Sequence, residues 1–397
     1  MFSKKTIEDV DVAGKKVLVR VDFNVPIADG TVTDDTRIQA ALPTIRYLVQ
    51  EGAKVILMSH LGRPAGTGFE EKYSLVPVGR VLGRILGQDV KVIPDLAGEA
   101  AHAAVEAMQP GQVIILENTR FDKREKKNDE ALSRDLASLG DLYVNDAFGT
   151  AHRAHASTAG IASFLPAVSG YLLAREVETL GDMLASPQRP FVAILGGSKV
   201  SDKIAVIDHL LDIVDVLIIG GGMCFTFLAA QGLETGKSLM EADWIERAKE
   251  MMDKAKKNGV QLLLPIDVVA ADRFAPDADS IICAADEIPA DRMGLDIGPS
   301  TCLLYGQAIR KAKTIFWNGP MGVFEMEAFE NGTKQVALAV ARNKGAQSII
   351  GGGDSVAAIK KFDLADQVTF VSTGGGASME LVEGKVLPGV AALDDKE

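Results

Sequence analysis

The stretch Phe191–Ile204, FVAILGGSKVSDKI, places a continuous apolar run directly ahead of two glycines and two lysines. The run FVAIL has the length and the apolar character of a strand that is buried on both faces. Glycines at the end of such a strand are typical of a tight turn and of backbone that approaches an anion closely. The stretch does not match the phosphate loop G-x-x-x-x-G-K-[ST]. It therefore predicts a strand, a turn and a helix start, with an anion site whose kind the rest of the chain must define.

Short apolar runs of this type alternate with longer amphipathic stretches along the whole chain. Because the runs are apolar throughout rather than alternating, they indicate parallel sheets built from strand–helix–strand units. In the first half the runs are KVLVRVD (16–22), KVILMSH (54–60), VKVIPD (90–95), QVIILEN (112–118) and LYVND (142–146). In the second half they are FVAILGG (191–197), VLIIGGG (216–222), QLLLPID (261–267), KTIFWNG (313–319), QSIIGGG (347–353) and QVTFVSTGGG (367–376).

A chain of 397 residues exceeds what one hydrophobic core usually organises, so we expect two domains. Between the halves, residues 170–190 carry a helical stripe of leucines and valine that ends at Pro187 and Pro190. This segment is either a hinge helix or one more packing helix of a single sheet. We predict an α/β fold with two doubly wound, Rossmann-like parallel-sheet domains joined by a hinge helix. The predicted parts are residues 1–170 completed by the tail 384–397, the hinge helix and linker 171–190, and residues 191–383.

Composition sets limits on partners and location. Hydrophobic residues at 47% and charged residues at 24% are ordinary for a globular protein, and the net charge of −12 argues against a nucleic-acid surface. The N-terminus has no signal-peptide core, and the apolar tract 214–230 is interrupted by Asp215 and three glycines, which argues against a membrane span. We therefore expect a cytoplasmic protein.

Cysteine and histidine spacing gives no metal signature. The three cysteines, Cys224, Cys283 and Cys302, lie far apart, which fits a reducing compartment. Two of them, Cys224 and Cys302, have apolar neighbours and are predicted to be core residues. His152 and His155 are three residues apart without a carboxylate or cysteine in ligand spacing, so zinc is disfavoured.

Charged side chains follow the apolar runs of the first half. In open parallel sheets ligands bind beyond the carboxyl ends of the strands, so these side chains are expected at one edge of the sheet. The planar fork of arginine suits a bidentate grip on carboxylate or phosphate. A single such residue would be read as a surface ion pair, but five strand ends of the same character predict a pocket for a small polyanion. The residues are Asp22, Asn24, His60, Arg63, Arg120, Asn145 and Asp146, with Arg37 at a helix start and His152, Arg153 and His155 after the fifth run.

Glycine clusters follow the apolar runs of the second half. One cluster can serve the shape of a tight turn alone, but four at successive strand ends point to a nucleotide with its phosphates. The clusters are Gly196-Gly197, Gly220–Gly222, Gly351–Gly353 and Gly374–Gly376. No G-x-G-x-x-G with an acidic residue at the proper distance is present, so a dinucleotide is disfavoured.

Two lysines and one aspartate complete this predicted nucleotide site. If a helix begins near Ser198, Lys199 and Lys203 are four residues apart and share one face beside the bound anion. Asp354 directly follows a glycine triplet. It is a natural carboxylate for Mg²⁺, which usually takes one or two carboxylates together with phosphate oxygens.

Taken together, these residues resemble the phosphoglycerate kinase family. The resemblance spans the whole chain in order and is carried by RVDFNVP, SHLGRP, ENTRF, NDAFGTAHRAHAST, GGSKVSDKI, IIGGGM, RMGLDIGP, FWNGPMGVFE, GGGDS and STGGGAS. It implies an enzyme, a phosphotransferase with a carboxyl acceptor. The implied reaction is reversible phosphoryl transfer between ATP or ADP and the carboxylate of 3-phosphoglycerate, which forms 1,3-bisphosphoglycerate in glycolysis and gluconeogenesis. It also implies Mg²⁺ bound with the nucleotide, and a monomer.

The resemblance assigns roles residue by residue. The implied phosphoglycerate site comprises Asp22, Phe23, Asn24, Arg37, His60, Leu61, Gly62, Arg63, Arg120 and Arg153. The implied nucleotide site comprises Gly196, Lys203, Gly221, Gly222, Gly294, Asn318, Pro320, Glu325, Gly352, Gly353, Asp354 and Ser355, with Glu325 at the ribose and Asp354 at the metal. Around the transferring group it places Arg37, Lys199, Lys203 and the backbone of Gly374 and Gly375.

Two other functions remain to be weighed. A non-catalytic, nucleotide-responsive metabolite-binding protein would keep both pockets, although substitution of Lys203 or Arg37 would have favoured it and both are present. A dehydrogenase is disfavoured by the missing dinucleotide fingerprint. The enzyme interpretation also explains why no general base stands out, because a carboxylate acceptor is already ionised at neutral pH.

Overall fold

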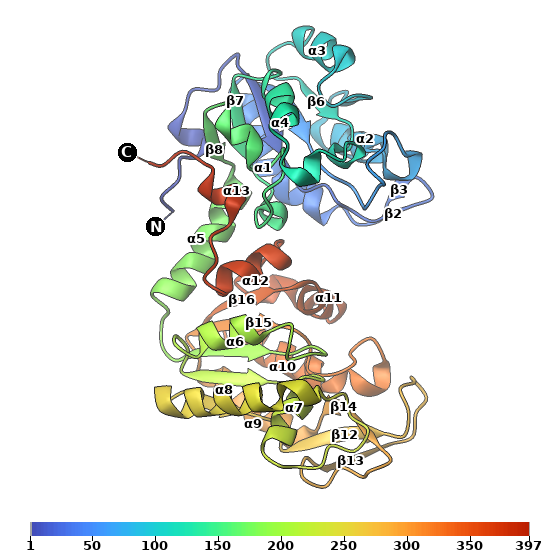
Figure 1. Cartoon of the computed structure of the whole chain (residues 1–397), viewed down its shortest axis with the longest axis vertical. Coiled ribbons are helices and arrows are strands. Elements are labelled where there is room, and N and C mark those ends of the chain that lie inside the picture. The colour runs from blue at the N-terminus through green and yellow to red at the C-terminus, as the bar shows by residue number, and fades with distance from the viewer. Residues whose placement is uncertain (1, 397) are drawn as a thin grey trace. The chain divides into compact units, whose positions relative to one another are not determined.

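The computed structural model describes residues 2–396, which fold into two compact units (Figure 1). The N-terminal unit contains the residues up to Thr179 together with the segment from Val386 onward, and the C-terminal unit contains Leu180–Lys385. The division falls within helix α5 (Tyr171–Ala185), which ends two residues before Pro187. The stretch with the predicted helical stripe therefore is a helix, and the chain passes from one unit to the other along it.

The N-terminal unit is built on a six-stranded parallel sheet in the order β5-β6-β4-β1-β7-β8. The strands are β1 (Lys16–Arg20), β4 (Lys54–Met58), β5 (Lys91–Ile93), β6 (Val113–Leu116), β7 (Leu142–Asn145) and β8 (Ala167–Ser169). The helices besides α5 are α1 (Thr36–Gln50), α2 (Val76–Leu86), α3 (Glu99–Glu106), α4 (Glu130–Ala137) and α13 (Pro388–Ala391), and β2 (Ile27–Ala28) pairs with β3 (Thr31–Val32). All five apolar runs predicted in this half form strands, and β8 is an edge strand that they did not include.

The core of this unit forms because strand side chains point alternately to the two faces of the sheet. Val17 and Val19 of β1 and Val55 of β4 lie in one cluster with α1 and α2, to which Ile38 and Leu82 contribute. Their neighbours in sequence, Leu18 on β1 and Ile56 on β4, are fully buried as well. Burial on both faces is what a continuous apolar run requires, and it leaves the strand ends as the place where charge can be exposed.

The C-terminal unit has the same architecture, with a parallel sheet in the order β11-β10-β9-β15-β16-β17. Its strands are β9 (Phe191–Leu195), β10 (Val216–Ile219), β11 (Gln261–Leu263), β15 (Thr314–Asn318), β16 (Gln347–Gly351) and β17 (Phe370–Val371). The helices are α6 (Ile204–Leu210), α7 (Cys224–Ala230), α8 (Ile245–Asn258), α9 (Pro299–Lys311), α10 (Asn331–Arg342), α11 (Gly353–Lys361) and α12 (Gly376–Val382). The predicted α/β fold with two doubly wound parallel sheets is therefore confirmed.

One element of this unit differs from the prediction. A three-stranded antiparallel sheet is formed by β12 (Asp267–Ala271), β13 (Ser280–Ala284) and β14 (Met293–Ile297), in the order β13-β12-β14. The predicted run 261–267 divides here, because β11 ends at Leu263 and β12 begins only after Pro265. Proline has no N–H to give to a sheet, so it interrupts the strand where the apolar pattern alone continues.

Candidate active site

The strand ends of the N-terminal sheet carry a cluster of bonded charges. Asp22 follows β1, and its Oδ2 accepts a hydrogen bond of 2.6 Å from Nη1 of Arg37 at the start of α1. The Nδ1 atom of His60, which follows β4, lies 3.9 Å from Oδ1 of the same carboxylate. Three residues that the sequence placed at one edge of the sheet are thus neighbours. Nearly all of Asp22 is buried, at 8% exposure, while Arg37 stays half-exposed.

The imidazole of His60 is held as a neutral hydrogen-bond donor. Burial lowers the pKa of His60 well below its ordinary value, and the charges of Arg20, Arg120 and Arg37 lower it further. Nη2 of Arg20 lies 3.2 Å from its Nδ1. A guanidinium can only donate, so Nδ1 must accept and the ring proton must sit on Nε2. His60 can therefore donate from Nε2 to an anion without carrying a charge itself.

Arg120 joins the cluster from the end of β6. Its Nη1 donates to the carbonyl oxygen of Gly62 (2.8 Å), and the N–H of Gly62 donates to Oδ1 of Asn24 (2.8 Å). Burial and the charges of Arg20 and Arg153 lower the pKa of Arg120 to about 10. Its buried Nε has no hydrogen-bond partner among residues 2–396. An unsatisfied buried donor of this kind favours an anionic ligand.

The other sequence-predicted residues of this cluster differ in what they can offer. Arg63 and Arg153 are exposed, and Nε of Arg153 bonds to Nε2 of His152 at 3.1 Å. The side chains of Phe23 and Leu61 point into the interior, at 0% and 5% exposure. The N–H of Phe23 already donates to Oγ of Ser59, and its carbonyl accepts from Val25. Phe23 thus supports the loop and has no free polar group for a ligand.

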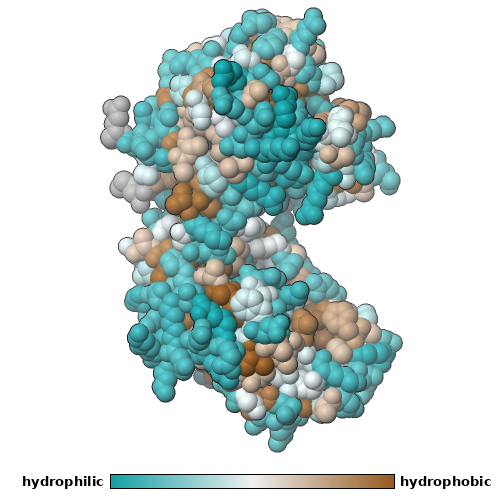
Figure 2. Space-filling model, viewed as in Figure 1, coloured by the Kyte–Doolittle hydropathy of each residue, from teal (hydrophilic) through white to brown (hydrophobic). Residues whose placement is uncertain are grey.

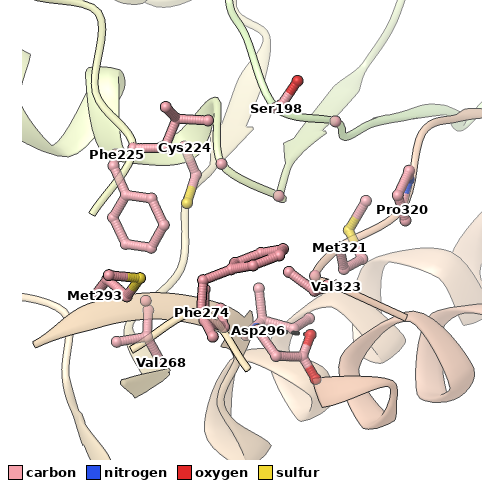
Figure 3. Close-up of a pocket in the computed structure, with 18 of the residues that line it drawn as sticks. Ser198, Cys224, Phe225, Val268, Phe274, Met293, Asp296, Pro320, Met321 and Val323 are labelled. Atoms are coloured by element: carbon pink, nitrogen blue, oxygen red, sulfur yellow. Dashed lines mark hydrogen bonds between the residues drawn. The ribbon is translucent and has the colours of Figure 1, made fainter. Parts of the chain in front are cut away.

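In the C-terminal unit a cavity of about 540 Å³ opens beside β14 and α7. Its walls are mainly apolar, and Figure 3 shows Phe225 and Met293 toward one end, Phe274 in the middle, and Ser198 and Pro320 toward the other end. On the face shown in Figure 2, brown and tan side chains gather near α7 and β14 with teal residues around them, consistent with the 61% exposure of Phe274. An apolar slot with a polar end suits a flat aromatic group attached to an anion.

A second cavity of about 300 Å³ adjoins the first, because Gly197, Ser198 and Asp354 line both. Its lining is polar and rich in backbone. The residues are Gly196, Gly197, Ser198, Lys199, Asp202, Lys203, Asn318, Gly319, Gly352, Gly353, Asp354, Ser355, Gly375, Gly376 and Met379. With the first cavity, this lining includes every residue that the sequence assigned to the nucleotide site. Gly221, Gly222, Gly294, Pro320 and Glu325 line the larger cavity.

The family model for phosphoglycerate kinase matches residues 7–385. The chain is 57% identical to the phosphoglycerate kinase of Clostridioides difficile (strain 630), which it matches over the full length of both chains. It is 56% identical to that of Clostridium tetani (strain Massachusetts / E88), over 100% of this chain and 99% of the relative.

Solved structures of the same kind match the fold. The phosphoglycerate kinase from Coxiella burnetii superimposes with a TM-score of 0.90 at 45% identity, and the one from Pyrococcus horikoshii OT3 with 0.84 at 34%. Each match covers 98% of both chains.

The chain belongs to the phosphoglycerate kinase family. As a phosphoglycerate kinase it is a phosphotransferase of glycolysis with a carboxyl acceptor, and it transfers a phosphoryl group reversibly between ATP and 3-phosphoglycerate. The full-length matches favour this enzyme over a non-catalytic binding protein. No helix among residues 2–396 is long and apolar enough to cross a membrane.

One sequence prediction about the phosphoglycerate kinase site is wrong. Lys199 and Lys203 do not share a helix face, because α6 begins at Ile204 and Lys203 is its N-cap. Residues 198–203 form a loop with a turn in which the N–H of Lys203 donates to the carbonyl of Val200 (2.9 Å). The two glycines let the chain leave β9 in an irregular path before the helix starts. Both lysines nevertheless line the smaller cavity.

Lys203 is the more constrained of the two lysines. Its Nζ donates to Oδ1 of Asn318 at the end of β15, and burial lowers its pKa although Asp354 and Asp202 oppose the shift. The Nδ2 of Asn318 is buried without a hydrogen-bond partner among the described residues. The smaller cavity thus presents two ammonium groups, those of Lys199 and Lys203, and the unsatisfied amide of Asn318, a combination that suits phosphate oxygens.

The glycines of these cavities serve two distinct needs. A Cβ on Gly196 would lie 2.0 Å from the carbonyl oxygen of Pro320, and one on Gly221 would lie 2.6 Å from the nitrogen of Gly197. These glycines let neighbouring loops pack together. At Gly353, by contrast, a Cβ would meet nothing within 4 Å, so this glycine leaves the start of α11 open. Only an open position of this second kind leaves room for a ligand beside the glycine backbone.

Two further predicted groups turn inward. The hydroxyl of Ser355 accepts from the N–H of Gly319, so it stabilises the turn that follows β15. Gly374 is buried, and its N–H donates to Oγ of Ser372 (3.1 Å), whereas Gly375 lines the smaller cavity. Of the cysteines, Cys224 is buried as predicted and Cys302 is only half-buried.

Sequence reasoning did not find the buried layer beneath the N-terminal cluster. Nε of Arg20 donates to Oγ of Ser157 (2.8 Å), and Ser157 donates from Oγ to Oε1 of Glu125 (2.5 Å) and from its N–H to Oε2 (3.0 Å). All three residues are fully buried. Arg20 had a signal, since a charge inside the apolar run KVLVRVD requires buried partners. Glu125 and Ser157 had no such signal, because their positions in sequence do not reveal that their side chains are hydrogen-bonded to each other.

Proposed function

We propose that the N-terminal cluster binds 3-phosphoglycerate and that the two C-terminal cavities bind ADP or ATP. The observation that supports this assignment most strongly is the contrast in chemistry between them. One unit gathers arginines and histidine at its strand ends, and the other provides an apolar slot that leads to glycines and lysines. A small polyanion suits the first, and a nucleotide with base and phosphates suits the second.

The residues we assign to 3-phosphoglycerate are Asp22, Asn24, Arg37, His60, Gly62, Arg63, Arg120 and Arg153, with Phe23 and Leu61 shaping the loops that carry them. In this assignment His60 donates from Nε2 and the free Nε of Arg120 donates to the anion. The residues we assign to the nucleotide are those that line the two cavities, with the base in the larger one and the phosphates in the smaller. Glu325, exposed on the rim of the larger cavity, is assigned to the ribose.

The chemistry we propose is positioning and charge neutralisation. The acceptor carboxylate is ionised at neutral pH, so no general base has to create the nucleophile. Lys203, Lys199 and Arg37 would neutralise the oxygens of the transferring group, which is usually the largest catalytic contribution in reactions of this type. The backbone of Gly375 would add one N–H donor beside them.

The proposed metal site rests on Asp354. This carboxylate is exposed at the start of α11 and lines both cavities, so it faces the place assigned to the phosphates. No group of three or more histidine, cysteine, aspartate or glutamate side chains is arranged to hold a metal ion among residues 2–396. A Mg²⁺ ion that takes most of its ligands from phosphate and water fits such a site, and when bound it supplies positive charge to the phosphate oxygens.

We further propose that the two units approach each other by bending in the segment 171–190. Phosphoryl transfer requires the reacting atoms to come within about 3–3.5 Å, and the two ligands are assigned to different units. Binding of both ligands would favour the closed state. Small-angle scattering should show a smaller radius with both ligands than with none, and equal radii would contradict the proposal. We also propose that the protein is a cytoplasmic monomer that does not bind nucleic acid, as its net charge of −12 suggests.

A coupled assay tests the function. ATP consumption should depend on 3-phosphoglycerate and should be absent without it. Lys203→Ala is the matched variant with strongly reduced turnover, and Lys257→Ala, at an exposed lysine on α8, is the control. Binding of both ligands without turnover would favour the non-catalytic protein. Turnover of a nicotinamide cofactor instead of ATP would favour the dehydrogenase.

A further inference from the structure

One carboxylate outside the residues assigned so far holds the loop that carries both lysines. Glu241 lies at the end of the segment that follows α7. Its Oε2 accepts from the N–H of Ser201 (3.0 Å), and its Oε1 accepts from the Ser201 hydroxyl (2.6 Å). Its own N–H donates to Oγ1 of Thr226 in α7 (3.1 Å). Glu241 therefore ties the loop 198–203 to α7 by a two-point contact.

The same segment also forms part of the larger cavity. Lys237 and Leu239 line that cavity, and the hydroxyl of Ser238 accepts from the N–H of Gly294 on β14 (2.9 Å). The space between this segment and the loop is tight. A Cβ on Gly222 would lie 2.9 Å from the carbonyl oxygen of Ser198 and 3.1 Å from Leu239. Residues 237–239 thus border the cavity, and two residues later the chain contacts the lysine loop.

The loop needs such an external contact because no helix orders it. Lys203 is two residues after Ser201, and regular structure begins only at Ile204. Besides the turn closed by Lys203 and Val200, the loop is held at its beginning by the N–H of Met223, which donates to Gly197 (3.0 Å), in its middle by the buried side chain of Val200, and at its end by the bond from Nζ of Lys203 to Asn318. Irregular segments held by few contacts are the ones that open most readily. The bonds from Glu241 are therefore well placed to decide where Lys203 lies.

The contact is made by an ionised carboxylate. Burial opposes ionisation of Glu241, but hydrogen bonds from Ser201 and the N–H of Val200, with the charge of Lys199, lower its pKa below the ordinary value. Hydrogen bonds to an ionised acceptor are shorter and about twice as strong as neutral ones. The contact with Ser201 is accordingly persistent at neutral pH.

We propose that Glu241 is a positioning residue that couples the larger cavity to Lys203. A nucleotide base that packs against Leu239 orders the segment 237–241, and Glu241 transmits that order to the lysine loop. The inference rests on the catalytic role proposed for Lys203. Because Glu241 lines neither cavity, its loss should affect turnover more than nucleotide binding.

Two substitutions separate the contact from the charge. Glu241→Ala removes both hydrogen bonds and should lower kcat about tenfold, the effect of losing about 1.4 kcal/mol, with the KM for ATP changed less than about twofold. Glu241→Gln should retain most of kcat, because its amide oxygen can accept from the Ser201 N–H and its amide N–H can donate to the hydroxyl. Glu246→Ala on α8 removes an exposed carboxylate bonded to Lys249 and is the matched control.

The decisive measurement repeats Glu241→Ala in a Lys203→Ala background. If Glu241 acts through Lys203, the second substitution should lower kcat no further. An equal loss in both backgrounds would overturn the inference while leaving the role of Lys203 intact. A near-normal kcat for Lys203→Ala alone would overturn the proposed role of Lys203 and this inference with it. If Glu241→Ala does not fold, Ser201→Ala takes its place in the same cycle with a smaller expected loss.

Discussion

The N-terminal cluster and the C-terminal cavities differ in the groups that they offer to an anion: mainly side chains in the cluster and mainly backbone in the cavities. In the cluster the groups are side chains, and they bond to one another or to the backbone, as Arg37 does to the Asp22 carboxylate and Arg120 to the carbonyl oxygen of Gly62. In the cavities the groups are mostly backbone at glycine positions, with Lys199 and Lys203 as the cations. A charged side chain needs a partner before the ligand arrives, whereas a backbone N–H at a helix start does not. Under the proposed assignments, an anion that binds in the cluster competes with internal bonds, whereas in the cavities it meets open backbone groups and competes mainly with the bond from Lys203 to Asn318.

The largest expected effect is a loss of turnover, without a loss of nucleotide affinity, when a cation of the cavities is removed. Lys203→Ala should lower kcat by about 10³, the upper range for loss of one preorganised charged donor, and change the nucleotide Kd little. The reason is that an ammonium group at the transferring phosphoryl stabilises charge that develops in the transition state. Steady-state kinetics with calorimetric nucleotide binding measures both quantities. A large loss of affinity with normal kcat would make Lys203 a simple phosphate contact.

The corresponding change in the cluster should be somewhat smaller. Arg37→Ala should lower kcat by about 10², with kcat/KM falling in parallel and nucleotide Kd unchanged. It also removes the 2.6 Å partner of Asp22, so a modest loss of thermal stability should accompany it. Arg63→Ala, which removes an exposed arginine of the same cluster, should mainly raise the KM for 3-phosphoglycerate. If Arg37→Ala only raises that KM, Arg37 is a substrate clamp like Arg63.

Two glycines of the cavities should respond in opposite ways. Gly196→Ala drives a Cβ against the Pro320 carbonyl and should destabilise the protein by about 1–3 kcal/mol. Gly353→Ala has open space around it, so its Tm should stay near that of the parent while nucleotide affinity falls about tenfold, or about 1.4 kcal/mol. Thermal unfolding and nucleotide titration distinguish the two. Equal behaviour would mean that glycine serves one purpose throughout the cavities.

The smallest expected effect at neutral pH concerns the pH dependence of stability in the cluster alone. Burial, with the charges of Arg20, Arg120 and Arg153, lowers the pKa of His155 from 6.5 to about 4. The folded-state pKa lies below the unfolded value, so as pH falls the unfolded state takes up the proton first. Stability that is present above pH 6.5 is therefore lost progressively toward pH 4.

His155→Gln should flatten this dependence. Between pH 6.5 and pH 4, the Tm difference between parent and variant should change. The change should be roughly 2–4 °C for each kcal/mol by which protonation of His155 alters the free energy of unfolding. His102→Gln, at an exposed position on α3 outside the cluster, is the control. Parallel curves of Tm against pH for the parent and His155→Gln would contradict the inference that burial and the neighbouring arginines keep His155 uncharged in the folded protein.

Much of the architecture could be predicted from local pattern. Apolar runs such as KVILM of β4 form strands because they must be buried on both faces, and the stretch after Phe191 forms a strand and a turn as expected. The antiparallel sheet was missed because Pro265 divides a run that looks continuous, and because the apolar stretch Ser280–Ala284 was overlooked. This stretch forms a strand whose isoleucines, Ile281 and Ile282, stay exposed instead of entering a core. The helix start near Ser198 was also wrong, because loop contacts from Glu241 and Met223 outweigh local preference there.

The sequence by itself determined the two parallel sheets, the charged and glycine-rich strand ends, and the family. These features depend on residue type and on neighbours along the chain, which set strand burial and turn shape. Only the tertiary structure decided which of those residues meet. It pairs Arg37 with Asp22 and, because Arg20 donates to Nδ1 of His60, leaves the ring proton of His60 on Nε2. It also brings the Glu241 carboxylate into hydrogen-bond contact with Ser201, forty residues away. Such contacts join residues far apart in sequence, and their geometry follows from packing that no local pattern encodes.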